Sequence, residues 1–507
     1  MTKTRCTQVA SAAMMALLAG QAAFGQVIDS TWIDDTTGVW GDATRWSTPD
    51  FPTARGPDIY RAIIDFDAGG AYTIGVSSDI DLDQFVFTSG DATIDGGGVG
   101  TIVVRTDIEF GDATVRAVAE LMSEGTLRFT GDVLCEIDDT PACQIGASVQ
   151  KLGMGDIAFT GSTVFELMSG TTFTIENSGD LIGDSTARIL NDGTFIKQNL
   201  GLTLIEDVGF VNTGTVIIEQ GSLEITNPIL PSAATLGPST YDIGDGAVLN
   251  FTGTALSTNQ ADVIFRGPDS AFPQFSGVSL NEGLAQAENG ADITFSPTSG
   301  LVNEGTLLAD GAGSTITAAG AINNNTGTIT VLNGGVVTGN GSGINNNGGT
   351  VQGNGTLQAA TFINNGLVSP GTSPGVLVTE GVAGSGHVFQ QQTGGTLFIE
   401  IAGRMAGADH DVLDVRGIAL FDGTLDIEFS PFSGEPPVQP GDQFQIILAD
   451  GVDGQFRDVQ LRGLGAEGQV EVVFGSGGVV VVVRQIPTPG ALAVLGLGGL
   501  MAVRRRR

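Results

Sequence analysis

The sequence predicts an all-β protein with a right-handed parallel β-helix, a solenoid in which short strands stack coil upon coil. An Asn two residues before a Gly recurs at a constant spacing of 22 residues, at Asn303, Asn325 and Asn347, and it returns at Asn364. Runs such as Gly327-Thr-Ile-Thr-Val place β-branched residues between Gly and Asn, the pattern of strands and turns. No stretch between residues 26 and 485 has a helical period. A fixed period of this size indicates one unit stacked on copies of itself.

The repeated asparagines predict a ladder inside this solenoid. Stacked coils lie about 4.8 Å apart, and a side-chain amide both donates and accepts hydrogen bonds. We therefore expect Asn303, Asn325, Asn347 and Asn364 to bond one another from coil to coil, in turns whose left-handed backbone Asn tolerates. Unconnected surface turns would explain the residue type but not the spacing. An array of antiparallel sandwiches is the less favoured alternative fold.

The chain divides in order into five predicted segments. Residues 1–25 have a positive start at Lys3 and Arg5, a short apolar middle and small residues before Gln26, as a secretory signal does. The later predicted segments are an N-terminal cap at 26–60, β-helix coils at 61–380 with an irregular part at 228–275, a C-terminal β capping region at 381–485, and a sorting signal at 486–507.

The segment 26–60 contains the three tryptophans, Trp32, Trp40 and Trp46. The first coil of a solenoid has no neighbour on one side, so its apolar end needs a cover. Each large aromatic side chain buries about 150–250 Å². We expect the indoles to cap the solenoid, and a platform on which sugars stack is the alternative.

Export determines how the cysteines and the charge are interpreted. Cys135 and Cys143 remain after removal of the signal, and an oxidising compartment would allow a disulfide between them. The formal net charge of −35 excludes nucleic acid as a partner. The acidic residues are better explained by a solvated outer face than by a specific cation site. Loosely bound calcium is the alternative, but no calcium-binding motif occurs in register and no cofactor is predicted.

Several prolines interrupt the Asn–Gly spacing at 228–275. This stretch is either a looped insertion or a set of coils in which the Asn is replaced.

The end of the predicted coils reads Leu367-Val-Ser-Pro-Gly-Thr-Ser-Pro-Gly, and Asp411-Val-Leu-Asp-Val-Arg-Gly follows later. These motifs resemble those near the end of autotransporter-like β-helix passengers. The resemblance covers about residues 360–485 and implies that this region completes and caps the helix.

The last residues have a three-part pattern. Pro487, Thr488 and Pro489 precede a short apolar run, and Arg504, Arg505, Arg506 and Arg507 follow it. Arginines next to an apolar segment stay on the cytoplasmic side of a membrane. The pattern resembles the PEP-CTERM sorting signal, with Thr488 at the position where that family has Glu. The resemblance implies an exosortase-like processing enzyme as partner, a transient membrane contact through a C-terminal helix, and a Gram-negative-type bacterium.

The residues contain no catalytic set. His410, between Asp409 and Asp411, is better explained as an exposed turn than as a metal site, because a zinc site needs three or four ligands. We therefore expect a non-enzymatic, structural or adhesion-type protein of the cell surface, outer envelope or extracellular matrix, with exopolysaccharide or other surface glycans as further partners. The alternative is a polysaccharide-binding or polysaccharide-degrading β-helix enzyme of pectin-lyase type.

Overall fold

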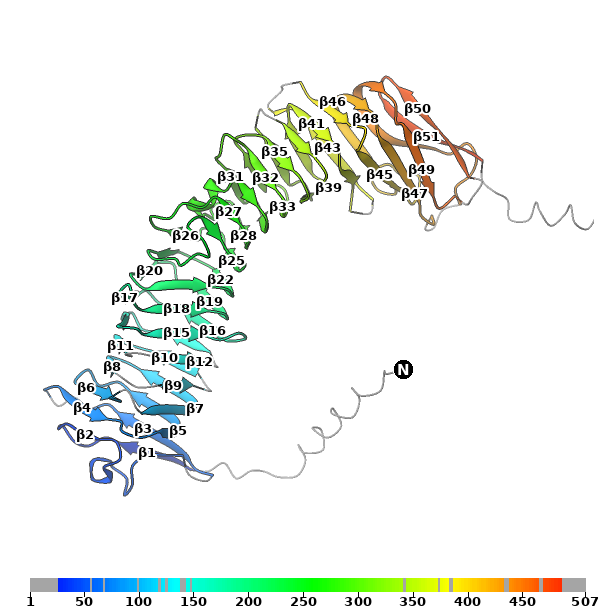
Figure 1. Cartoon of the computed structure of the whole chain (residues 1–507). Coiled ribbons are helices and arrows are strands. Elements are labelled where there is room, and N and C mark those ends of the chain that lie inside the picture. Colours follow the sequence, from blue (N-terminus) through cyan, green and yellow to red (C-terminus); the bar gives the residue numbers. More distant parts are fainter. Residues whose placement is uncertain are drawn as a thin grey trace, which may run out of the picture. The chain divides into compact units, whose positions relative to one another are not determined.

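The computed structural model describes residues 26–485 apart from 55–56, 67–68, 98–99, 117–119, 124–125, 137–142, 146–147, 341–342, 373, 383–385, 433–436 and 465–467. The protein is all-β, with 56% strand and 2% helix, and its parallel stacked coils form a β-solenoid of about 13 turns (Figure 1). The predicted parallel solenoid is confirmed. Two compact units are distinguished, residues 1–193 with 206–209, and residues 194–205 with 210–507.

The first unit contains strands of two parallel sheets. One contains β1 (Val27–Thr31), β3 (Ile59–Ile64), β5 (Ile80–Phe87), β7 (Thr101–Phe110), β9 (Glu120–Ser123), β10 (Thr126–Phe129), β12 (Cys143–Ile145), β13 (Val149–Lys151), β15 (Val164–Leu167), β16 (Thr172–Ile175) and β18 (Arg188–Asn191). The other contains β2 (Gly38–Val39), β4 (Tyr72–Gly75), β6 (Ala92–Asp95), β8 (Ala113–Arg116), β11 (Val133–Glu136), β14 (Ile157–Thr160) and β17 (Leu181–Gly183). A 3₁₀ turn, η2 (Ala43–Arg45), lies between β2 and β3.

The second unit contains further strands of these same two sheets and the strands of a third sheet. The first contains β19 (Thr194–Lys197), β21 (Gly209–Asn212), β22 (Thr215–Ile218), β25 (Thr240–Ile243), β28 (Asp262–Arg266), β30 (Leu284–Glu288), β33 (Thr306–Asp310), β36 (Thr328–Leu332), β39 (Thr350–Gly353), β42 (Leu367–Pro370), β45 (Thr396–Ile401), β47 (Thr424–Phe429) and β49 (Asp458–Arg462). The second contains β20 (Leu202–Glu206), β23 (Ser222–Ile225) and β26 (Val248–Phe251).

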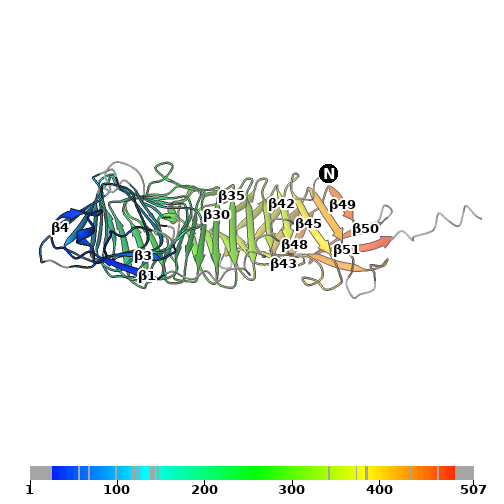
Figure 2. The same cartoon turned by 90° about the horizontal axis from the view of Figure 1, so that it is seen from below.

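The third sheet of this unit carries the asparagine repeats. It contains β24 (Thr235–Leu236), β27 (Thr258–Asn259), β29 (Leu280–Asn281), β31 (Asp292–Phe295), β32 (Leu301–Asn303), β34 (Thr315–Ala318), β35 (Ile322–Asn324), β37 (Val336–Gly339), β38 (Ile344–Asn346), β40 (Thr356–Ala359), β41 (Thr361–Asn364), β43 (Val376–Glu380), β44 (Val388–Gln391), β46 (Val412–Phe421), β48 (Gln443–Gly454), β50 (Gln469–Gly475) and β51 (Gly478–Gln485). A 3₁₀ turn, η3 (Pro273–Gly277), precedes β29. Figure 2 shows strands of this unit, such as β30 and β42, following one another along the stack.

Alternating burial explains why these short segments form strands. In β33 and β36 every second side chain is buried, as expected for a strand with one face on the core. Leu307 lies opposite Ile329, which lies opposite Val351, and all three side chains are fully buried. The core of the solenoid is therefore a set of apolar columns that continue from one coil to the next.

The coils continue through residues 228–275. Thr240 of β25 pairs in parallel with Thr215 of β22 on one side and with Asp262 of β28 on the other. The stretch therefore consists of coils rather than a looped insertion, but the Asn is not replaced in β27, where Asn259 is fully buried. Within this stretch one sheet ends at β26 and another begins at β24, and η3 contacts both β26 and β31.

At the C-terminal end the pairing changes from parallel to antiparallel. β45, β47 and β49 are parallel, as are β46 and β48. Strand β51 then runs antiparallel to β48 and to β50. Antiparallel strands cannot continue the winding, so this hairpin ends the stack of coils.

Candidate functional site

A buried column of side-chain amides runs through the second unit. Its members are the last residues of β27, β29, β32, β35, β38, β41 and β44, and six of the seven are fully buried. The column comprises Asn259, Asn281, Asn303, Asn324, Asn346, Asn364 and Gln391. We call it the amide ladder.

Each rung satisfies its polar atoms within the wall of the solenoid. Nδ2 of Asn281 donates to Oδ1 of Asn303 at 2.8 Å, to the carbonyl oxygen of Gly283 at 3.1 Å, and to that of Thr306 in the next coil at 3.1 Å. The same 2.8 Å amide-to-amide distance recurs at every step of the ladder. Buried polar groups cost free energy unless they are paired, so the ladder holds neighbouring coils together and fixes their register.

The predicted ladder exists, but its predicted register is wrong in two coils. Asn303 and Asn364 belong to it, whereas the residues between them are Asn324 and Asn346. Asn325 and Asn347 instead form an outer pair, joined by an Nδ2-to-Oδ1 bond of 3.0 Å at the exposed surface. The reason is turn length: Asn303 lies two residues before Gly305, whereas Asn324 lies three residues before Gly327. Asn346 likewise lies three residues before Gly349, the equivalent glycine of the next coil, with Gly348 as the additional turn residue.

The explanation from left-handed turns is also wrong. Among the described residues, the non-glycine residues with positive φ are Asp112, Asp207, Asn289 and Asn333, and no ladder residue is among them. The ladder asparagines lie at strand ends and are selected for their amide groups.

Gly349 and Gly366, which follow the ladder residues Asn346 and Asn364, are required by close approach between coils. A Cβ at position 349 would lie 2.3 Å from the carbonyl oxygen of Gly327 and 2.4 Å from Nδ2 of Asn324. A Cβ at position 366 would lie 2.3 Å from the carbonyl oxygen of Gly349. Neither contact is sterically possible, so glycine lets each turn stack directly on the turn of the preceding coil.

Two buried lysines also donate hydrogen bonds to backbone carbonyl oxygens, and the sequence analysis predicted neither of them. Nζ of Lys197 donates to the carbonyl oxygen of Asn199 at 2.6 Å and to that of Gln220 at 3.1 Å. Burial lowers the pKa of Lys197 to about 8. Lys151 is also fully buried, and its Nζ donates to Gly153 at 3.2 Å. Fully buried lysines are rare, but the two-residue period that places Phe195 inside places Lys197 there as well.

The Asp409-His410-Asp411 triplet is not the exposed turn that we expected. His410 is 1% and Asp411 is 2% exposed. The carboxylate of Asp411 accepts N–H bonds from Gly375 at 3.0 Å and from Glu400 at 2.8 Å. Asp411 therefore ties the end of the Ser-Pro-Gly repeat to β45, and burial raises the pKa of its carboxyl group to about 7.

The cap tryptophans are buried, which argues against a sugar-stacking platform formed by them. Trp32, Trp40 and Trp46 are 0%, 3% and 3% exposed. The ring centroids of Trp32 and Trp46 are 5.2 Å apart, with the rings edge to face. The ring centroid of Trp40 lies 5.7 Å from that of Phe85 in β5. Their contacts are those of a hydrophobic cap on the first coils.

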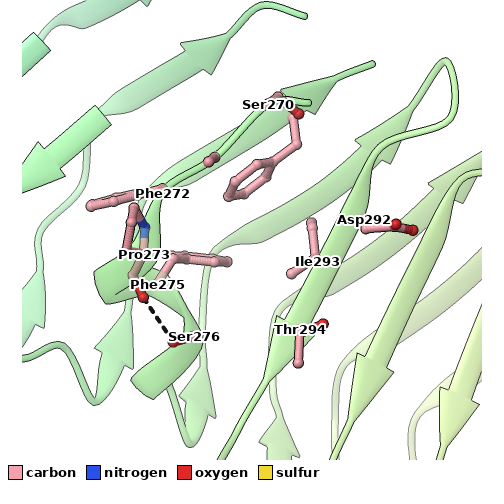
Figure 3. A pocket seen from close by; sticks show the side chains of 10 residues that line it. Ser270, Phe272, Pro273, Phe275, Ser276, Asp292, Ile293 and Thr294 are labelled. Atoms are coloured by element: carbon pink, nitrogen blue, oxygen red, sulfur yellow. Dashed lines mark hydrogen bonds between the residues drawn. The ribbon is translucent and has the colours of Figure 1, made fainter. Parts of the chain in front are cut away.

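A cavity of about 190 Å³ opens beside η3 in the second unit (Figure 3). Phe272 and Phe275 come from the loop and η3, and Ile293 and Thr294 come from β31. The phenylalanine rings stack on each other with centroids 5.9 Å apart and are nearly fully buried. Ser276 Oγ bonds the carbonyl oxygen of Pro273 within its own turn. These groups stabilise η3, where a strand would otherwise continue the sheet.

A larger cavity of about 530 Å³ in the first unit is lined by Asp112, Asp132 and Asp156. These aspartates repeat from coil to coil, and each accepts the backbone N–H of the next: Asp132 bonds Asp112 at 3.0 Å, and Asp156 bonds Asp132 at 2.8 Å. The carboxylates thus stabilise stacked turns. No group of His, Cys, Asp or Glu side chains in the described part of the chain is suited to hold a metal ion.

Several predicted features lie outside the described residues. These are the signal at 1–25 and the sorting signal, with Pro487, Thr488, Pro489, Arg504, Arg505, Arg506 and Arg507. Cys135 in β11 and Cys143 in β12 have described backbones only, so their disulfide stays a prediction. Within residues 26–485, no described helix has the length and apolar character needed to cross a membrane.

Comparison with known proteins assigns no family. No protein-family model matches the chain, and no curated protein matches it significantly.

Proposed function

We propose that this chain is an exported structural protein of adhesion type, a β-solenoid scaffold of the cell surface, outer envelope or extracellular matrix. The observation that carries the proposal is the amide ladder. From Asn259 to Asn364 its rungs direct their amides to one another and to turn carbonyls, and they are fully buried. Such a column stiffens the wall and serves mechanical rather than chemical purposes.

Export and sorting complete the proposal, and the two ends of the sequence support them. Residues 1–25 have the features of a secretory signal. The prolines at 487 and 489, the apolar run and the four terminal arginines resemble a tail read by an exosortase-like enzyme. In this proposal the tail pauses in the membrane, the enzyme removes it, and the solenoid is deposited outside the cell.

Deletion of residues 487–507 tests the sorting step. The full chain and the deletion variant are expressed in a Gram-negative-type bacterium that has an exosortase-like enzyme, and cell fractions and intact masses are compared. We expect the full chain to lose its tail and reach the surface, and the variant to accumulate in another fraction. Equal location, with the tail retained in the mass of the full chain, would rule out sorting.

A polysaccharide-degrading enzyme is the second candidate, favoured by the carboxylate-lined cavity at Asp112, Asp132 and Asp156. Glycoside hydrolysis uses two carboxylates about 5–9.5 Å apart on one groove. A reducing-sugar assay with neutral and acidic polysaccharides separates the candidates. Turnover that disappears in Asp132→Asn would establish the enzyme and replace the structural proposal.

A further inference from the structure

The N-terminal cap contains a cavity that its tryptophans do not occupy. The cavity measures about 210 Å³. Its lining residues are Ile28, Thr48, Pro49, Asp50, Phe51, Thr53 and Tyr60. Phe51 and Tyr60 are only partly buried, unlike the three indoles of the same segment. Two aromatic side chains therefore remain accessible at the end of the solenoid.

The floor of this cavity belongs to the first coils. Ile28 of β1 and Tyr60 of β3 are direct neighbours in the parallel ladder. Strand alternation places them on the same face as the buried Ser30 and Ala62. The cavity thus lies where the core of the first unit reaches its N-terminal end.

The opposite wall is the loop 47–54, which is fixed along its length. Ser47 N–H donates to the carbonyl oxygen of Thr31 at 2.8 Å, and the hydroxyls of Ser30 and Thr48 are 2.6 Å apart. Further along, the Trp40 indole N–H donates to the carbonyl oxygen of Pro52 at 3.3 Å. At the end of the loop, the backbone N–H of Ala54 donates to the carbonyl oxygen of Asp81 at 2.6 Å. A wall held at both ends gives a pre-formed site, which lowers the entropic cost of binding.

The lining combines aromatic surface with a carboxylate at the rim. Asp50 is exposed, and its Oδ1 accepts the backbone N–H of Phe51 at 3.1 Å, which restrains the carboxylate. Aromatic rings pack against the C–H faces of a sugar, and carboxylate oxygens accept hydrogen bonds from its hydroxyl groups. A ligand that carries a carboxylate would be repelled by Asp50 and by the acidic chain as a whole.

We propose that the cavity between Phe51 and Tyr60 binds one neutral hexose unit of a surface polysaccharide. This inference rests on the proposed surface role, and it names the class of glycan that the scaffold would hold at its N-terminal end. The tryptophans contribute indirectly, because Trp40 fixes the loop that forms one wall.

Titration of the purified full chain with defined sugars tests the site directly. The probes are maltotriose, cellotriose and mannotriose, with trigalacturonic acid as the acidic comparison, and binding is followed by calorimetry. We expect at least one neutral trisaccharide to bind and the acidic one not to bind. Phe51→Leu and Tyr60→Leu, which keep apolar volume but remove the ring, should each weaken binding at least tenfold.

Phe66→Leu is the matched control, because Phe66 is 38% exposed in the same unit and does not line the cavity. It should leave the affinity unchanged, and thermal unfolding should confirm that all three variants fold. Asp50→Asn should raise the affinity for trigalacturonic acid relative to wild type. Absence of neutral-sugar binding at millimolar concentration, or equal affinity in wild type, Phe51→Leu and Tyr60→Leu, would overturn the site. Since the titration uses purified protein, its failure would leave the surface proposal intact, which the tail deletion tests separately.

Discussion

Nδ2 of Asn303 donates to Oδ1 of Asn324 at 2.8 Å, and Asn325, the next residue, faces the surface. Asn324 therefore belongs to the buried amide ladder, whereas the side chain of Asn325 bonds that of its counterpart Asn347 on the outside. Adjacent residues of identical chemistry thus have different energetic roles, set by which face of the chain each occupies.

We predict that Asn324→Ala destabilises the second unit and that Asn325→Ala does not. The first substitution removes the acceptor of Asn303 and the donor to Asn346, both fully buried. A buried group left unpaired costs about 1–3 kcal/mol. Asn325 is partly exposed, and a surface substitution changes stability by about 0.5 kcal/mol or less. Urea unfolding of both variants measures the difference, and equal midpoints would contradict a stabilising ladder.

We also predict that Gly349→Ala is strongly destabilising. The added Cβ would lie 2.3 Å from the carbonyl oxygen of Gly327, which is backbone and cannot move alone. Gly386→Ala is the control, because a Cβ there meets nothing within 4 Å. The melting temperature should fall in the first variant and stay near wild type in the second. A fall of equal size in both would mean that close stacking of turns is not the reason for glycine.

The buried carboxyl group of Asp411 should make stability depend on pH. Desolvation raises its pKa in the folded state to about 7, from an ordinary value of 3.8, although N–H bonds from Glu400 and Gly375 act in the other direction. The folded state then binds the proton more tightly than the unfolded state, so this contribution to stability is full below about pH 4 and is lost as pH rises to about 7.

Asp411→Asn should remove that part of the pH dependence, measured as the unfolding free energy between pH 4 and pH 8. Asp422 provides a contrast of opposite sign, because its hydrogen bond from Arg457 lowers its pKa. Its contribution is present at neutral pH and is lost as pH falls through the lowered pKa, so Asp422→Asn should flatten the acidic side only. An unchanged curve for Asp411→Asn would show that the carboxyl group is not buried as described.

The stability of the N-terminal cap should depend on its three indole side chains. Trp46 is 3% exposed, its ring contacts both Trp32 and Trp40, and its Nε1 donates to the carbonyl oxygen of Trp40 at 2.8 Å. Truncation of a buried Trp to Ala costs about 3–5 kcal/mol. We expect Trp46→Ala to unfold the first coils selectively, seen as faster hydrogen exchange in β1 and β3. Uniform exchange across the first unit would indicate that the cap has no local role.

The solenoid and its stacked asparagines were predictable from sequence because a coil repeats both its apolar positions and its turns. Leu307, Ile329 and Val351 recur every 22 residues and do form one core column. The Asn–Gly spacing could not predict which asparagines form the ladder, because it assumes that the turn after every ladder asparagine has the same length. One additional turn residue after Asn324 means that the residue two before the Gly is its partly exposed neighbour, Asn325.

Other features were missed because they carry no repeated signal. Asn259 begins the ladder but is followed by Gln260 and Ala261 rather than by Gly. Gln391 ends it with a different amide, and its Nε2 donates to the carbonyl oxygen of Thr424 at 3.0 Å. The burial of Asp411 depends on contacts with Gly375 and Glu400, which are distant in sequence. The cavity at Phe51 and Tyr60 likewise arises from a loop that returns over β1 and β3.

Hydrogen exchange of the side-chain carboxamides tests the amide ladder most directly. Nuclear magnetic resonance resolves these NH₂ groups, and single Asn→Asp variants assign the signals of Asn324 and Asn325. The ladder predicts that the Asn324 carboxamide exchanges orders of magnitude more slowly than that of Asn325, because only the first is buried and bonded on both sides. Equally fast exchange of both carboxamides would contradict the ladder and the scaffold role built on it.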